Sequence, residues 1–81
     1  MNHQMLFEKL IGHCCHVISE YPNGVIQVAD MQVKAIPGSM ITGDNNTIII
    51  PWQAAVIEAL GEEDFKISIG ENMRFFITIL D

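Results

Sequence analysis

Residues 47–60 read TIIIPWQAAVIEAL, and this stretch decides the fold. A β-branched run leads to Pro51, and a second apolar run follows it. The first run predicts a buried strand at Thr47–Ile50, because β-branched residues favour strands. The second run fits two structures. As a strand after a proline kink it predicts a small barrel, whereas as a helix over 51–60 it predicts an α+β domain.

The helical alternative rests on residue propensity. Pro51 suits the first position of a helix, where its missing N–H costs nothing. Alanine, glutamate and leucine between 54 and 60 favour helix, and Gly61 would cap its C-terminus. The face that such a helix would bury consists of Trp52, Val56, Ala59 and Leu60. Propensity slightly favours this helix, whereas the family resemblance given below favours the strand.

The N-terminal part of the chain predicts one helix followed by a strand. Residues from Gln4 to Ile11 carry an apolar stripe at helical spacing. Asn2 suits the N-cap position of this helix, and Gly12 suits the C-cap position. The next residues, from His13 to Glu20, alternate between two faces, which predicts a strand. In that strand Cys15, Val17 and Ser19 face one side, and Cys14, His16, Ile18 and Glu20 face the other.

A hairpin is expected next. Tyr21 to Gly24 contains Asn-Gly between two β-like runs, which is a strong hairpin signal. Val25 to Ile36 resumes the alternation, with a bulge or bend expected at Asp30-Met31. Beyond it the sequence predicts a turn, a short strand and a second turn, at Pro37-Gly38, Ser39–Thr42 and 43–46.

The end of the chain predicts a second hairpin. Residues 65–69 and 74–80 alternate on either side of a turn at 70–73. Phe75 and Phe76 are neighbours on a strand and therefore face opposite sides of the sheet. One of them is expected in the core, and the other needs a second cover, such as a subunit interface.

The expected architecture is a single domain over 1–81 that is mainly β with a short N-terminal helix. We expect a small, strongly bent β-barrel plus a C-terminal β-hairpin, with the α+β domain as the alternative. Of the 81 residues, 49% are hydrophobic and only 17% are charged. A domain this small cannot bury so many apolar side chains, and exposed apolar patches usually become interfaces. The composition therefore predicts a homo-oligomer.

Charge indicates the class of partner. The net charge is −6, and the cations Lys9, Lys34, Lys66 and Arg74 are dispersed along the chain. Proteins that bind nucleic acid through phosphates need clustered Lys or Arg, so this balance argues against nucleic acid. The acidic excess points to a basic partner or serves solubility.

The location of the protein follows from what the sequence lacks. No apolar run approaches the ~20 residues that span a bilayer, and the N-terminus lacks the basic region of a signal peptide. Cys14 and Cys15 are adjacent and cannot staple distant segments by a disulfide. We therefore expect a protein of the cytoplasm, in a bacterium or in a cell infected by a phage.

Several short motifs resemble a known family. Leu10-Ile11-Gly12 followed by Val17 resembles its junction between helix and first strand, and Asn23-Gly24 lies where its first hairpin turns. Residues 48–60 resemble its last two strands. The family is the Sm-like (LSm/Hfq-like) small β-barrels, in which a short helix leads into a bent five-stranded barrel that assembles into rings. The resemblance covers roughly residues 5–60 and implies a barrel and a ring.

The RNA-binding part of this resemblance is weak. In the bacterial members a Tyr-Lys-His triplet between the last two strands contacts RNA, and here Trp52-Gln53-Ala54 takes its place. The Arg-Gly pair of the eukaryotic members is absent too, and residues 62–81 have no counterpart in the minimal fold. The resemblance therefore supports the architecture more than RNA binding.

No motif predicts catalysis, a metal site or a cofactor. His13-Cys14-Cys15-His16 offers metal ligands, but in a strand neighbouring residues face opposite sides, so each face would supply only two. A cysteine nucleophile needs an adjacent base, and His13 and His16 point away from the neighbouring cysteines. No P-loop, dinucleotide fingerprint or Gly-x-Ser-x-Gly motif occurs. We therefore expect a protein that is not an enzyme.

The candidate binding residues lie around the deciding stretch. Glu62-Glu63-Asp64 is either a patch for a basic partner or a solvated turn before a strand. Trp52, beside Gln53, is either an exposed anchor that stacks on a planar ligand or a core aromatic.

Three functions remain open. The first is a homo-oligomeric binding protein that occupies a protein partner, as small acidic phage inhibitors or adaptors do. The second is an oligomer that sequesters a small nucleotide-like ligand at subunit interfaces. The third is an Sm-like RNA binder, which the charge balance disfavours.

Overall fold

The computed structural model describes residues 3–36, 39–42, 48–51 and 53–80. Within them the chain is mainly β with one short N-terminal helix, as predicted. The elements are α1 (His3–Leu10), β1 (Cys14–Glu20), β2 (Ile26–Ile36), β3 (Ser39–Thr42), β4 (Ile48–Pro51), β5 (Ala55–Ala59), β6 (Asp64–Ile69) and β7 (Met73–Ile79). The predictions that lie outside the described residues are those at Asn2, Pro37-Gly38, 43–46, Thr47 and Trp52.

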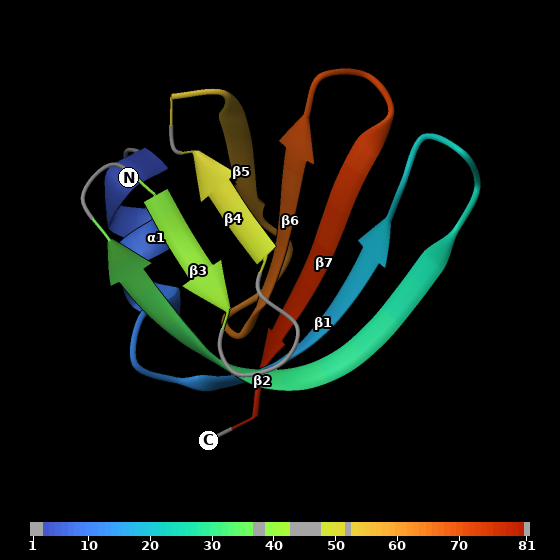
Figure 1. The fold of residues 1–81 in the computed structure, drawn as a ribbon. Helices are drawn as coiled ribbons and strands as arrows, with labels where there is room; N and C mark the ends of the chain where they lie inside the picture. The colour runs from blue at the N-terminus through green and yellow to red at the C-terminus, as the bar shows by residue number, and fades with distance from the viewer. Residues whose placement is uncertain (1–2, 37–38, 43–47, 52, 81) are drawn as a thin grey trace.

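The seven strands form one antiparallel sheet in the order β4-β3-β2-β1-β7-β6-β5. The predicted C-terminal hairpin is confirmed as β6 and β7. It is not an addition to the sheet, however, because β7 pairs with β1 along Cys15–Glu20. Figure 1 shows the two hairpins β1–β2 and β6–β7 side by side at the centre of the sheet. The end of the chain therefore completes the central part of the fold.

The sheet curls but does not close into the expected barrel. β4 and β5 are its two edges, and within the described residues no pairing joins them. They are nevertheless consecutive along the chain, and residues 52–54 can span at most about 14 Å between them. The curl therefore brings the end of β4 close to the start of β5. Pro51 ends an edge strand, where a residue without an N–H is tolerated.

The stretch after Pro51 is a strand, which confirms the strand expected with the barrel, and the alternative of a helix over 51–60 is wrong. Ala55 and Ile57 are buried, whereas Val56 and Glu58 are exposed, which is the alternation of a strand. β5 also pairs with β6 throughout, from Ala55 opposite Ile69 to Ala59 opposite Phe65. A helix here would leave the edge of β6 unpaired. Pairing across the sheet overrides the helical propensity of the alanines.

The first hairpin turns where Asn-Gly predicts it. Gly24 has a φ of 85° and its N–H donates to the Tyr21 carbonyl at 3.0 Å. The Val25 N–H donates to Asn23 Oδ1 at 3.1 Å, as in an Asx turn. The bulge expected at Asp30-Met31 is absent, because β1 and β2 keep one register throughout their pairing. β2 instead curves along its length, from β1 to β3 (Figure 1).

The core lies on the inner side of the curled sheet, under α1. Its fully buried side chains include Phe7, Leu10, Val17, Phe65 and Phe75. α1 contacts β5 and ends one residue earlier than expected. Gly12 follows it with a φ of 89°, and its N–H donates to the Val33 carbonyl at 2.8 Å. Among the described residues, no helix is long and apolar enough to cross a membrane.

Candidate functional site

Most of the predicted site residues lie on the β5–β6 hairpin. Gln53 precedes β5 and is exposed, and Glu62 and Glu63 are exposed in the turn that follows β5. Asp64 begins β6 and is also exposed. The structure thus places four of the five predicted residues on the β5–β6 hairpin, with Gln53 before β5 and the three acids at the turn beyond it, while Trp52 lies outside the described residues.

The turn between β5 and β6 is held by its backbone. The Leu60 and Gly61 N–H groups both donate to the Asp64 carbonyl, at 2.8 and 3.3 Å. The Ile79 N–H donates to the Glu63 carbonyl at 2.9 Å, and the Asp64 side chain accepts from Thr78 Oγ1 at 2.8 Å. These bonds fix where the chain turns and leave the Glu62 and Glu63 side chains exposed.

We name this surface the acidic edge. It consists of the exposed side chains Val56, Glu58, Leu60, Glu62, Glu63 and Asp64. Lys66 stands opposite Glu58 in the register and is the one cation of the hairpin. The acidic edge therefore combines a negative excess with two large exposed aliphatic side chains. Sequence reasoning missed Val56 and Leu60 as surface residues, because the expected strand was given no inner and outer face and the helical alternative placed both in the core.

A second surface is the outer face, the side of strands β2, β1, β7, β6 and β5 that points away from the core. The register places its side chains in rows across the strands. One row holds Ile26, Glu20, Arg74 and Ser68, the next holds Val28, Ile18, Phe76 and Lys66, and the third holds Asp30, His16, Thr78 and Asp64. A hydrophobic row thus lies between two polar rows.

The polar rows contain close cross-strand contacts. His16 Nδ1 lies 2.6 Å from Asp30 Oδ1, and Arg74 Nη1 lies 4.0 Å from Glu20 Oε1. All four side chains are substantially exposed, so these pairs contribute little to stability. The alternation in the sequence places each residue on its face, but only the register shows which residues pair. This is why sequence reasoning missed the outer face as a patterned surface.

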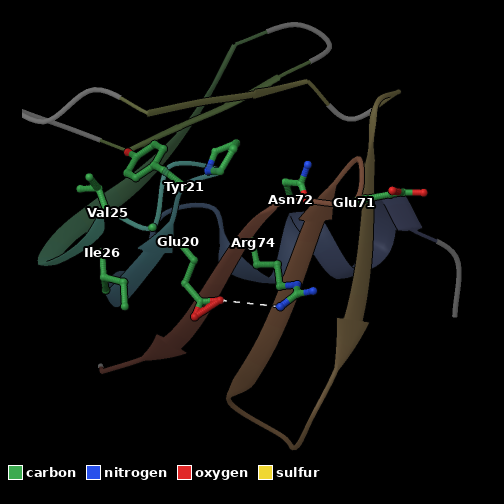
Figure 2. Close-up of a pocket in the computed structure, with 9 residues that line it drawn as sticks. Glu20, Tyr21, Val25, Ile26, Glu71, Asn72 and Arg74 are labelled. Atoms are coloured by element: carbon green, nitrogen blue, oxygen red, sulfur yellow. Dashed lines mark ion pairs between the residues drawn. The ribbon is translucent and has the colours of Figure 1, made fainter.

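A hollow of about 280 Å³ opens between the turns of the two central hairpins. The ring of Tyr21 lies on one side of it and Asn72 on the other, with Glu20 and Arg74 between them (Figure 2). Tyr21 donates from its hydroxyl to Gln27 Oε1 at 3.1 Å, which orients the ring. The volume falls just below the roughly 300–1,000 Å³ typical of small-molecule sites.

The cysteine-histidine run is split between the two sides of the sheet. Cys15 is buried, and its thiol lies 3.7 Å from the His13 carbonyl, whereas Cys14 is exposed. His16 lies on the outer face, beside Asp30. The part of the chain that the structure describes holds no group of three His, Cys, Asp or Glu side chains placed to bind a metal ion.

Comparisons with known proteins assign no function to this site. No family model matches the chain, and neither the curated proteins nor the solved structures gave a match. The resemblance to Sm-like proteins stays a prediction.

Proposed function

We propose that this protein is a non-enzymatic, homo-oligomeric binding protein of the cytoplasm that acts by occupying a basic protein partner, as an inhibitor or adaptor does. The observation that carries the proposal is the acidic edge. Glu58, Glu62, Glu63 and Asp64 gather there beside exposed Val56 and Leu60. Exposed aliphatic side chains favour a protein surface as the partner, and the carboxylates select a basic one.

The chain's overall charge supports the same class of partner. At a net charge of −6, the whole molecule attracts cations and repels nucleic acid. A small ligand is the weaker alternative, because the hollow at Tyr21 is below the usual size of a small-molecule site and carries both Glu20 and Arg74. The acidic edge, by contrast, is open and carries mostly one sign of charge.

The test removes carboxylates from the acidic edge and leaves its shape unchanged. Glu62→Gln/Glu63→Gln raises the net charge by two, and Glu71→Lys, in the β6–β7 turn, raises it by the same amount. Each variant serves as bait in a lysate of the organism that encodes the chain. We expect the wild type and Glu71→Lys to retain one basic protein, and the double Gln variant to bind it roughly tenfold more weakly.

Salt provides a second readout of the same complex. Retention by the wild type is expected to fall steeply as salt rises, because the contacts are exposed charge pairs. Equal retention by all three baits would show that the acidic edge does not bind the partner. Failure of the wild type to retain any host protein would contradict the proposed function itself.

A further inference from the structure

The centre of the outer face holds two pairs of unlike side chains, arranged symmetrically about the line between β1 and β7. Glu20 of β1 stands opposite Arg74 of β7, and Ile18 stands opposite Phe76 one row away. The strands are antiparallel, and each pair places one member on either side of the line. Such an arrangement is complementary to itself when a second copy is turned over and laid upon it.

Among the residues that the structure describes, nothing covers the hydrophobic row on this face. Ile18 and Phe76 point away from the core and are partly exposed, and Val28 beside them is 59% exposed. Ile26, in the adjacent row, is 60% exposed. Together these four side chains make a continuous apolar band across three strands. Bands of this kind on small proteins usually mark an interface.

We propose that two copies of this chain pack their outer faces together around a two-fold axis that runs parallel to the strands, between β1 and β7. Glu20 of each copy then faces Arg74 of the other, and Ile18 of each faces Phe76 of the other. The Glu20–Arg74 pair within one chain is long, at 4.0 Å, and its side chains are 36% and 51% exposed. Both groups therefore have room for a second ionic contact.

Charge selects this axis over the perpendicular one. A two-fold axis along the Ile18–Phe76 row would place Lys66 against Lys66 and Glu58 against Glu58, and like charges in contact oppose association. The proposed axis instead places Glu20 against Arg74 in the first row and Ile18 against Phe76 in the second row. In the third row Asp30 faces Asp64, so we expect the contact to centre on the first two rows.

The size of the face predicts a reversible dimer. Because the sheet curls, only its central strands can lie against a second copy; four strands about 4.8 Å apart, over about 20 Å of their length, give a footprint of at most roughly 400 Å². Stable interfaces bury about 800 Å² of accessible surface per partner, which is close to a sixth of this chain's 4943 Å². The outer face therefore belongs to the smaller interfaces, and association is best measured at up to about 100 µM chain.

The experiment exploits compensation between two different variants. Glu20→Arg gives each copy two arginines at the centre of the face, and Arg74→Glu gives each copy two glutamates. Each variant alone repels itself and is expected to sediment at the 9.1 kDa chain mass, with association at least tenfold weaker than in the wild type. An equimolar mixture of the two is expected to restore a dimer, because arginines then face glutamates across the interface.

Two features make the mixture decisive. Mixing cannot restore the pair within one chain, so recovery reports only contacts between copies. The variants carry net charges of −4 and −8, two units either side of the wild type's −6, so overall charge does not draw them together. Glu71→Lys, which has the same charge change as Glu20→Arg but lies in the β6–β7 turn, is expected to remain dimeric. Far-UV circular dichroism confirms that each variant is folded.

The inference rests on the homo-oligomeric part of the proposed function and specifies its surface. It is overturned if the wild type sediments as a monomer up to about 100 µM, if both single variants stay dimeric, or if the mixture dimerises no more than its components. A monomeric wild type would also remove the homo-oligomeric part of the proposed function, whereas dimeric single variants or an inactive mixture would reject only this surface. The bait experiment on Glu62 and Glu63 tests the partner and is independent of all three results.

Discussion

Replacing Val17 by aspartate will unfold the chain, whereas the same replacement at Ile18 will leave it folded. Val17 lies in β1, the strand between β2 and β7. Its side chain is in the core, and the residue is 1% exposed. Among the described residues, no buried side chain is a cation that could pair with a carboxylate there. Burying such a group costs several kcal/mol, which approaches the whole stability of about 4–12 kcal/mol expected for a domain of this size.

Ile18→Asp is the matched control, one residue further along the same strand. Its side chain lies on the partly exposed outer face, where a carboxylate stays hydrated. Far-UV circular dichroism with a urea titration distinguishes the two variants. The expected result is a disordered Val17→Asp and a cooperatively unfolding Ile18→Asp that no longer dimerises. The opposite order of stabilities would mean that the two faces of β1 have been exchanged.

Removing the ring of Phe7 will destabilise the protein by about 3–5 kcal/mol, the usual cost of Phe→Ala in a core. Phe7 is fully buried, and it lies in α1, which has only eight residues. A helix this short is not stable alone in water, so its packing against the sheet maintains it. Loss of the ring therefore loosens the helix as well as the core. We expect the melting temperature to fall by more than about 10 °C.

The control for α1 is Met5→Ala, two residues earlier in the same helix. Met5 is 50% exposed, so its truncation is expected to change the free energy of unfolding by no more than roughly 0.5 kcal/mol. Differential scanning calorimetry measures both variants. If Met5→Ala and Phe7→Ala lowered the free energy of unfolding equally, the side of α1 that carries Phe7 would not be the side packed against the sheet.

The local features of the fold could be predicted from the sequence. The Asn-Gly turn at 23–24, the alternation in β1 and the opposite facing of Phe75 and Phe76 all follow from spacings of a few residues. These features depend on the chain's own geometry and on simple two-residue periodicity.

The long-range features could not be predicted from the sequence. The position of β7 beside β1 joins segments about sixty residues apart, and no local pattern encodes it. The same holds for the Glu20–Arg74 pair and the outer face, which appear only once the register is known. The acidic run at 62–64 can be recognised in the sequence alone. The exposure of its neighbours Val56 and Leu60, by contrast, follows only once residues 55–59 are known to form a strand.

The central claim is that residues 55–59 form an edge strand paired with β6, since this places the acidic edge on the surface. Nuclear Overhauser contacts test it most directly. Ile57 lies opposite Ile67, and both side chains face the core, so methyl contacts between these two residues are expected. Strong sequential amide–amide contacts from Ala55 to Leu60, without any contact to Ile67, would indicate a helix and contradict the account.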